Sequence, residues 1–442
     1  MRKHKGYDDY KDSGVEWMGE IPEGWSVLAF KRLGDFQSGA GFPDEEQGLE
    51  DEELPFYKVS DTNLAGNERL MTKHNNTVSR ETAKMLRAYV FPKDSIIFAK
   101  VGAALLLNKR RILTSPSCID NNMMGFIPRT CNRDWMFYWM CGLDLGELAN
   151  RGAVPSINER QIREIRVPVL PPKEQRSIAA FLDHKTSEID ALITNKEKLI
   201  ELLKEQRQTI ITEAVTKGLN PDAKMKDSGV EWIGEIPEHW MTIRLKYKAQ
   251  LIIRKATESE SELIYIGLEN IEPKTGRLIG DMEQIIDGDA LLFERSQVLF
   301  NKLRPYLSKC FLATCNGRCS SELFVLNAKS ILPKFLYYTM LADLFIQTVN
   351  SSTYGVKMPR ANWTFVGDVR ITVPSSSEQQ TIAAFLDHKT SEIDALITKE
   401  RTQIEKLKSY RQSLIFEAVT GKIDVRDWSD KPLERSEAVA NA

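Results

Sequence analysis

The sequence lacks the short motifs that mark most enzymes acting on nucleotides, esters or peptides. None of the patterns GxGxxG, GxxxxGK[ST], HExxH and GxSxG occurs. NPPY and DPPY, which an adenine methyltransferase places beside its cofactor, are also absent. With 442 residues the chain has room for two to four domains. A chain of this size without a catalytic constellation is more typical of a binding protein than of an enzyme.

Long apolar runs are missing too, so no segment is predicted to span a membrane. The first residues, MRKHKGYDDYKDSG, contain no apolar stretch, which argues against a secretory signal. The six cysteines form no CxxC pair, and we interpret them as reduced thiols of a cytoplasmic protein. A zinc site made of Cys310, Cys315 and Cys319 is the alternative, but the usual pairing of ligands is absent.

An excess of positive charge is also absent, because the net charge is −2. This value argues against binding of nucleic acid through bulk charge. It leaves room for local basic clefts, because contacts to phosphate are local.

What the chain does have is an internal duplication. The seventeen letters IAAFLDHKTSEIDALIT at 178–194 recur unchanged at 382–398, an offset of 204. KDSGVEWMGEIPEGW at 11–25 recurs with two changes at 226–240. The interiors between these flanks, roughly 26–170 and 241–374, resemble each other weakly. Copied flanks indicate surfaces that meet the same partner or each other, and divergent interiors indicate two sites that read different things. A recent duplication that is still drifting is the alternative.

Residues 173–217 and their copy, which ends near Gly421, are each predicted to form one long helix, because neither contains an internal glycine or proline. Pro171 and Pro172 precede the first helix, and Gly218 follows it. In the second copy Ser375 stands three residues before Glu378, the spacing of a capping box.

Apolar residues in both helices recur at seven-residue spacing, which is typical of a coiled coil. A helix of this length needs a partner, and we expect the two copies to pair antiparallel with one variable domain at each end. Such a pair would act as a ruler between two modules. The apolar residues assigned to the seam are Leu182, Ile189, Leu203 and Ile210 with Ile178, Leu192 and Leu199, and Leu386, Ile393, Leu407 and Leu414 with Ile382 and Leu396.

Each interior is predicted to be a mixed domain with short strands and one aromatic helix. The expected fold class is α+β: two α/β domains of similar fold, separated by two long helices that pair as an antiparallel coiled coil with pseudo-twofold symmetry. The helices at 132–150 and 331–350 carry aromatic faces, which we interpret as core rather than as platforms for base stacking. His184 and His388, inside the identical segments, are expected to contact a partner rather than to catalyse a reaction.

Polar and basic residues between the predicted strands, and in a loop after each aromatic helix, are candidates for DNA contacts. Lysine and arginine bind phosphate or guanine, and asparagine pairs with adenine. Loops on a rigid base are where recognition usually occurs. A solvated basic loop is the alternative for each of them. The candidates are Lys100, Asn108, Lys109, Arg110, Arg111, Asn121, Asn122, Ser156 and Asn158 in the first half, and Asn301, Lys302, Arg304, Tyr306, Lys309, Arg318, Ser320, Tyr354, Lys357, Arg360 and Asn362 in the second.

The order of variable domain, copied helix, variable domain, copied helix resembles the specificity subunit of type I restriction-modification systems. The motifs that carry this resemblance are LPPKEQRSIAAFLDHKTSEIDALI, its copy SEQQTIAAFLDHKTSEIDALI, SGVEWMGEIPEGW with its repeat, and LFNKLRPYLSKCFLA followed by CSSELFVL. They cover nearly all of the chain from about 11 to 422. VPSSSEQQ departs from the family pattern, which usually has prolines before the Glu-Gln pair.

The resemblance implies two target-recognition domains, each reading one half of a bipartite target in double-stranded DNA. The helices would set the gap between the half-sites and dock two methyltransferase subunits. Restriction motor-nuclease subunits would join them. This chain would hold no cofactor, because S-adenosylmethionine, ATP and Mg²⁺ would bind to the partner subunits.

The resemblance also divides the chain into segments. These are 1–170 and 221–374 as recognition domains, 171–220 and 375–422 as conserved helices, and 423–442 as a tail. Two alternatives stay open: a rod-like adaptor that presents two protein-binding modules, and a fusion of methyltransferase and specificity subunit.

Overall fold

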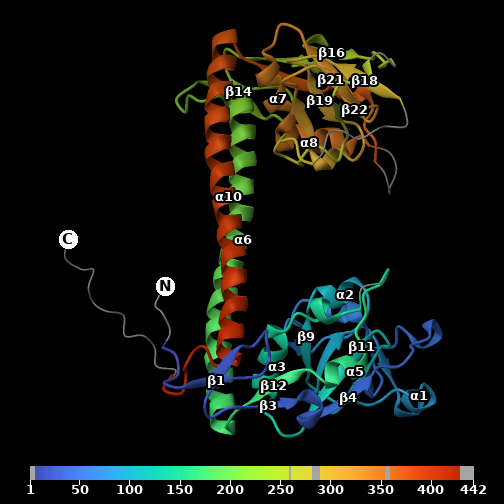
Figure 1. Ribbon diagram of the computed structural model, residues 1–442. Helices are drawn as coiled ribbons and strands as arrows, with labels where there is room; N and C mark the ends of the chain where they lie inside the picture. Colours follow the sequence, from blue (N-terminus) through green and yellow to red (C-terminus); the bar gives the residue numbers. More distant parts are fainter. Residues whose placement is uncertain (1–4, 151, 258–259, 281–288, 354–358, 429–442) are drawn as a thin grey trace. The chain divides into compact units, whose positions relative to one another are not determined.

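The computed structural model describes residues 5–150, 152–257, 260–280, 289–353 and 359–428, which form two compact units (Figure 1). Unit 1 contains residues 1–194 and 403–442, and unit 2 contains residues 195–402. The long helices α6 (Pro172–Lys217) and α10 (Ser376–Val419) are therefore divided between the units. Each unit combines one interior domain with the first part of the helix that follows it and the last part of the other helix.

The interior domain of unit 1 is built on a five-stranded sheet with the order β4-β11-β8-β9-β6 and a three-stranded sheet with the order β10-β5-β7. Its strands are β1 (Tyr10–Asp12), β2 (Glu20–Pro22), β3 (Ser26–Ala29), β4 (Gly34–Ser38), β5 (Leu54–Tyr57), β6 (Leu70–Met71), β7 (Thr77–Val78), β8 (Ile96–Ala99), β9 (Arg110–Leu113), β10 (Cys118–Ile119), β11 (Met123–Pro128) and β12 (Arg166–Val169). Its short helices are α1 (Arg80–Met85), α2 (Ala103–Leu106), α3 (Arg133–Gly142), α4 (Leu145–Leu148) and α5 (Glu159–Arg163).

The interior domain of unit 2 is built on a four-stranded sheet with the order β16-β22-β19-β20 and a three-stranded sheet with the order β17-β21-β18. Its strands are β13 (Met225–Asp227), β14 (Glu235–Pro237), β15 (Met241–Arg244), β16 (Ala249–Ile252), β17 (Tyr265–Ile266), β18 (Ala290–Phe293), β19 (Val298–Asn301), β20 (Cys310–Leu312), β21 (Gly317–Ser320), β22 (Leu323–Ala328) and β23 (Arg370–Val373). Its short helices are α7 (Pro333–Leu341), α8 (Asp343–Ser351) and α9 (Trp363–Asp368).

The two interior domains share a topology despite their weak sequence similarity. The strand order β4-β11-β8-β9 in unit 1 corresponds to β16-β22-β19-β20 in unit 2. The parallel pair β10 with β5 corresponds to β21 with β17, and the antiparallel pair β12 with β3 corresponds to β23 with β15. The prediction of two α/β domains of similar fold is confirmed.

Helix α3 attaches the sheet of unit 1 to the long helix α6 (Figure 1). It begins after Asn132, whose side chain accepts a hydrogen bond from the backbone N–H of Trp135. Tyr138 donates its hydroxyl to Asp183 on α6 at 2.6 Å, and the backbone N–H of Asn132 donates to Gln175 on α6 at 2.6 Å. The aromatic side chains between these anchors are buried. The interpretation of this aromatic face as core is confirmed.

Unit 2 uses the same attachment with copied residues. Tyr338 on α7 donates to Asp387 on α10 at 2.8 Å, and the backbone N–H of Leu332 donates to Gln379 at 2.7 Å. Asp387 is the copy of Asp183, 204 residues later. Part of the identical sequence is therefore explained by contacts inside each unit.

The other copied segment forms a hairpin at the ends of the long helices. In unit 1, strands β1 and β2 pair antiparallel. Trp25, which follows the hairpin, donates its indole N–H to Glu174 near the start of α6 at 2.6 Å. Tyr10 donates its hydroxyl to the carbonyl of Gly421 just after α10, at 3.0 Å. The hairpin thus ties the beginning of one long helix to the end of the other.

In unit 2 the equivalent contact is more elaborate. Trp240 donates to Glu378 near the start of α10 at 3.0 Å, and His239 contacts the same carboxylate at 2.8 Å. His239 stands where the first copy has Gly24. Ser375 and Glu378 form the predicted capping box, with reciprocal hydrogen bonds of 3.1 and 3.3 Å. Burial alone would raise the pKa of Glu378, but the hydrogen bonds from Ser375, His239 and Trp240 outweigh it and lower the pKa to about 2.

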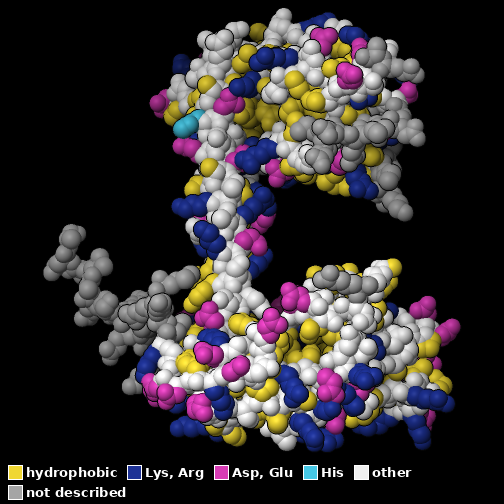
Figure 2. Space-filling model, viewed as in Figure 1, with side chains coloured by type: hydrophobic (Ala, Val, Ile, Leu, Met, Phe, Trp, Pro, Cys, Tyr) yellow, Lys and Arg dark blue, Asp and Glu magenta, His cyan; other side chains and the backbone are white. Residues whose placement is uncertain are grey.

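The long helices pair antiparallel in each unit, as predicted (Figure 1). In unit 1, Asp190 of α6 forms an ion pair with Arg411 of α10 at 3.0 Å. In unit 2, Lys196 pairs with Glu400 at 2.7 Å. The outer face carries side chains of both signs, which are interspersed along the helices in Figure 2. In the part of the chain that is described, no helix is long and apolar enough to cross a membrane.

The predicted seven-residue spacing of the seam is wrong in part. Leu182 and Ile189 are buried, but Leu192, Leu199 and Leu396 are exposed, with Leu192 at 50%. Buried isoleucines instead recur every eleven residues in both helices. Eleven residues make about three turns at 3.6 residues per turn, so this spacing keeps one stripe on one face. We call these residues the isoleucine ladder, which consists of Ile178, Ile189, Ile200 and Ile211 in α6, and Ile382, Ile393, Ile404 and Ile415 in α10.

A candidate nucleic-acid interface

Three loops of unit 1 meet where strand β8 ends. The backbone N–H of Lys100 donates to the carbonyl of Asn122 at 2.8 Å, which holds the turn before β11 beside the end of β8. The backbone N–H of Ile157 donates to the carbonyl of Lys100 at 3.0 Å, and Val101 forms a β-bridge with Ser156. Segments that are far apart in the sequence are thereby brought together. We call this group of loops the reading cluster of unit 1.

Unit 2 builds the same cluster with the same backbone contacts. The N–H of Lys302 donates to the carbonyl of Glu322 at 2.8 Å, and the N–H of Ala361 donates to the carbonyl of Lys302 at 2.8 Å. Leu303 forms a β-bridge with Arg360. Three groups of predicted DNA-contacting residues, which lie at separate places in each half of the sequence, therefore meet at one place in each unit.

The side chains on this shared frame differ in charge. In unit 1, Lys100 donates to the Ser38 hydroxyl at 2.9 Å, and Asn121 and Asn122 are exposed amides. Asparagine amides suit the paired donor and acceptor of adenine. The unit 1 cluster therefore presents one cation beside neutral hydrogen-bonding groups.

In unit 2 an acidic residue lies at the position of Asn122. Glu322 pairs with Arg360 at 2.5 Å, and Lys302 donates to the carbonyl of Ser321 at 2.7 Å. A carboxylate can accept a hydrogen bond from the amino group of cytosine. Glu322 was not among the residues predicted to contact DNA, because those residues were chosen for positive charge or for neutral hydrogen-bonding groups. The only available signal was its position, directly after the predicted Ser320 and its neighbour Ser321.

Burial lowers the pKa of both cluster lysines. For Lys100 and for Lys302 the loss of hydration is the main cause, and nearby carboxylates, led by Glu159 and Glu322 respectively, act in the opposite direction. Because each ammonium group is already partly dehydrated, a contact with a phosphate would remove less water than it would at a fully exposed lysine.

Several predicted residues have structural roles instead. Asn301 is fully buried, and its amide holds the carbonyls of Leu303 and Arg304 at 2.9 Å. Asn158 and Asn362 are the N-caps of α5 and α9. Asn301 therefore does not face a DNA surface, and the two caps use their side-chain oxygens within the protein.

Arg110 and Arg111 also lie inside the domain, only 2% and 8% exposed. A contact between either guanidinium group and a DNA base would require the domain to open. Lys109 and Asn108 are half-buried beside them, and Lys109 donates to Asn63. The predicted DNA contacts at this strand are therefore at odds with the burial of its two arginines.

Most of the remaining described candidates of unit 2 hydrogen-bond to backbone groups of the protein. Arg318 donates to the carbonyl of Leu263, and Lys309 donates to the carbonyl of Leu268. Tyr306 is exposed. The Ser320 hydroxyl oxygen accepts a hydrogen bond from the backbone N–H of Glu322 at 3.2 Å.

Arg304 has a left-handed backbone, with a φ of 52°, just before the short 3-10 helix Pro305–Leu307. Such strain in a residue other than glycine is concentrated at functional sites. Tyr354 and Lys357 lie outside the described residues.

The described residues contain no group of three or more His, Cys, Asp or Glu side chains that could hold a metal ion. Cys310 and Cys319 are buried free thiols, and Cys315 is exposed. The alternative of a zinc site at these cysteines therefore has no support from their arrangement.

Two units with one loop frame and different exposed side chains define a protein with two related but unequal binding surfaces. The family model for the type I restriction modification DNA specificity domain matches residues 22–202 and 271–406. The chain belongs to this family.

Relatives with this description come from bacteria and archaea. The chain is 22% identical over 317 residues to the type I restriction enzyme EcoDI specificity subunit of Escherichia coli, covering 67% of this chain and 71% of that one. It is 24% identical over 300 residues to the MjaVIII specificity subunit of Methanocaldococcus jannaschii, covering 62% and 66%.

The fold has a counterpart among solved structures. A chain from a structural study of the complex assembly and conformational transition of the type I R-M system superposes with a TM-score of 0.67. The two are 14% identical, and the match covers 91% of this chain and 99% of the other. At this identity the likeness concerns the fold, and it extends over both units.

Proposed function

We propose that this chain is the DNA-recognition subunit of a type I restriction-modification complex and that each reading cluster reads one half of a bipartite target. The observation that carries this proposal is the shared backbone frame of the two clusters, which holds Asn122 in one unit and Glu322 in the other. A constant frame with variable side chains is what two readers of different sequences require.

Recognition follows from the chemistry of the cluster side chains. Lys100 and Lys302 contact phosphates and position each unit, while Asn122 and Glu322 contact base edges in the major groove. A good base contact provides about 1–3 kcal/mol of discrimination. The target adenine is flipped out of the duplex by the partner that methylates it, at a cost of a few kcal/mol.

The chain catalyses nothing itself in this proposal. Two methyltransferase subunits dock on the copied outer faces of α6 and α10, and motor-nuclease subunits join them for restriction. S-adenosylmethionine, ATP and Mg²⁺ bind to those partners. Support comes from the exposed residues that are identical in both helices and that the contacts inside each unit do not use, such as Ser187 and Leu192 with their copies Ser391 and Leu396.

An exchange of one interior domain tests whether each unit reads its own half-site. Residues 26–170 are replaced by the equivalent segment of a relative, and methylated adenines are mapped in DNA from cells that also express the methyltransferase subunit. We expect one half-site to change and the other to stay. A change in both half-sites contradicts the proposal. An adaptor without DNA readout would show no specific binding and no steep loss of affinity with salt.

An insertion in both long helices tests the spacer. Twenty-two residues, two steps of the isoleucine ladder, are added after Lys196 and Glu400, which pair with each other. At 1.5 Å per residue the helices lengthen by about 33 Å, close to one turn of DNA of roughly ten base pairs. We expect the tolerated gap to grow by about ten base pairs with unchanged half-sites.

The matched control for this insertion adds eleven residues at the same places. The ladder stays in register, but about 16 Å corresponds to half a turn of DNA, so one cluster meets the wrong face of the duplex. This variant should fold and lose methylation. An unchanged gap in the longer variant would show that the helices do not set the spacing.

A further inference from the structure

A cavity of about 440 Å³ lies in unit 1 between the interior domain and helix α10. Its wall includes the basic residues Lys109, Arg110 and Arg111 at the start of β9, and Arg411 of α10. The reading cluster is a separate feature, because none of its three loops lines the cavity. The cavity therefore needs an explanation of its own.

Among the described residues, the two buried arginines of the cavity form no ion pair with a carboxylate. Their hydrogen bonds go to uncharged oxygens: Arg110 donates to Asn108 and to the carbonyl of Leu143, and Arg111 donates to the carbonyls of Arg110 and Thr62. The Nε atom of each arginine has no acceptor among the described residues. A guanidinium group has five N–H donors, so both arginines retain unused donors.

The carboxylates of the cavity wall are held by neutral donors. Asp144 accepts from the amide of Asn108 at 2.6 Å and from the backbone N–H of Gly146 at 2.8 Å. Glu68 accepts from the backbone N–H of Gly66 at 3.0 Å. Burying a cation without a paired anion is costly, and a wall with surplus positive charge favours an anionic ligand.

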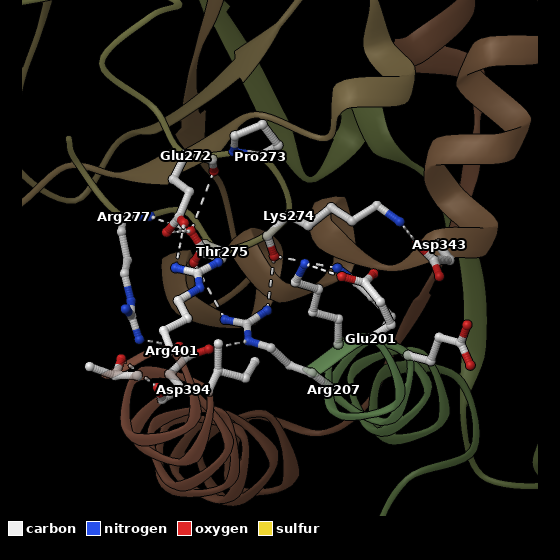
Figure 3. Close-up of a pocket in the computed structure, with 15 residues that line it drawn as sticks. Glu201, Arg207, Glu272, Pro273, Lys274, Thr275, Arg277, Asp343, Asp394 and Arg401 are labelled. Carbon is white, nitrogen blue, oxygen red and sulfur yellow. Dashed lines mark hydrogen bonds and ion pairs between the residues drawn. The ribbon is translucent and has the colours of Figure 1, made fainter. Parts of the chain in front are cut away.

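A matched cavity of about 460 Å³ lies in unit 2 (Figure 3). In unit 1, Arg411 pairs with Asp190 at 3.0 Å. Arg207 occupies the copied position of Arg411, 204 residues earlier, and makes the copied pair. It donates to Asp394 at 3.1 Å, and Arg277 pairs with the same carboxylate at 2.8 Å. Arg401 lies 4.0 Å from Glu272. The main cations of this cavity are therefore neutralised within the protein.

We propose that the unit 1 cavity binds a phosphate group, supplied either by the backbone of a bound DNA duplex or by a free phosphate-bearing solute. The forked guanidinium groups of Arg110 and Arg111 suit the oxygens of a phosphate. Lys109 adds charge at the half-exposed rim, whereas Arg411 is paired with Asp190. The unit 2 cavity does not bind phosphate, because Asp394 pairs with Arg207 and Arg277 and already neutralises their charge.

The first arm of the test uses free pyrophosphate and the full-length chain in a calorimetric titration. The variant is Lys109→Gln, because this rim residue can change without disturbing the buried arginines or the pair of Arg411 with Asp190. The matched control is Arg401→Gln in unit 2. If the solute is the source, Lys109→Gln weakens pyrophosphate binding about tenfold or more, as expected for a hydrogen bond to a charged group. The control leaves binding unchanged.

The second arm rests on the proposed function and uses the assembled complex with its DNA target over a series of salt concentrations. If the phosphate belongs to the DNA backbone, Lys109→Gln lowers the salt slope by about one while the methylated sequence stays the same. Equal losses in Lys109→Gln and in Arg401→Gln, or no effect of Lys109→Gln in either arm, overturn the proposal. Pyrophosphate binding by a chain that reads no DNA sequence would instead refute only the proposed function.

Discussion

At the end of β8 in unit 1 and of β19 in unit 2, the backbone makes the same hydrogen bonds, but the exposed chemistry differs. Asn122 offers an uncharged amide, whereas Glu322 offers a carboxylate that is paired with Arg360. The cavities beside α10 and α6 differ in the same manner, with surplus positive charge in unit 1 and compensated charge in unit 2. Both copies thus have the same backbone frame but carry different side chains on it.

This difference shows where duplication constrains the chain. Residues that attach an interior domain to a long helix, such as Asp183 and Asp387, are the same in both copies. On the reading clusters, the exposed Asn121 and Asn122 of unit 1 correspond to Ser321 and Glu322 of unit 2. Stability and specificity therefore rest on different sets of residues.

The largest expected effect concerns the isoleucine ladder. Ile415→Ala in unit 1 and Ile211→Ala in unit 2 should each destabilise their own unit by about 2–5 kcal/mol, because both side chains are fully buried and leave a cavity. The two units need not unfold together, so amide hydrogen exchange in each unit is the measurement.

The control for the ladder is Leu192→Ala, an exposed leucine on the same helix. It should change stability by less than about 0.5 kcal/mol. An equal loss from Leu192→Ala would show that the seven-residue seam, and not the eleven-residue ladder, holds the helices together.

An intermediate effect is expected at the reading clusters. Asn122→Ala and Glu322→Ala should each reduce base discrimination by about 1–3 kcal/mol at one half-site and leave the other unchanged. Methylation rates on targets with single base changes measure this. Lys100→Gln is the contrasting variant: it should weaken binding evenly across sequences, because a phosphate carries no sequence information. If Asn122→Ala alters both half-sites, the two clusters do not act independently.

The smallest effect concerns Glu378, the carboxylate that Trp240 and His239 contact in the hairpin of unit 2. The pKa of Glu378 falls from 4.5 to about 2 in the folded chain, so folding favours its ionised form. Its contribution to the stability of unit 2 is complete above about pH 4.5 and is lost as the pH falls towards 2. Because the side chain is about one-third exposed, this contribution should stay below about 1 kcal/mol.

Hydrogen exchange of unit 2 at pH 5 and pH 3 tests this prediction. The difference between the two pH values should shrink in Glu378→Gln. His239→Gly, which restores the residue found in the first copy, should have an intermediate effect. A Glu378→Gln chain with the original pH dependence would show that another group is responsible.

Much of the architecture could be predicted because its signals are local or repeated. The long helices follow from uninterrupted stretches without glycine or proline, and the capping box at Ser375 follows from a spacing of three residues. The period of the seam was misread because leucines such as Leu192 and Leu199 fit a heptad by chance. Heptad residues that are buried, such as Leu182 and Leu386, and the isoleucines spaced by eleven in both copies carried the correct signal.

The candidate site was predictable only in part. The sequence indicated Lys100, Asn122 and Arg360 as polar residues in loops, but it could not show which loops meet. Arg110 and Arg111 looked like exposed basic residues of a loop, yet they begin a buried strand. Burial depends on which distant segments pack over a residue, and no local pattern records that.

The sequence by itself determined the duplication, the two long helices and the presence of two α/β domains, because identity, helix-breaking residues and strand patterns are properties of neighbouring letters. Only the tertiary structure decided which polar residues form a reading cluster and which charges are neutralised. These outcomes depend on hydrogen bonds and ion pairs between residues far apart in the chain. For example, Arg207 pairs with Asp394, whereas Arg110 hydrogen-bonds only to uncharged oxygens among the described residues.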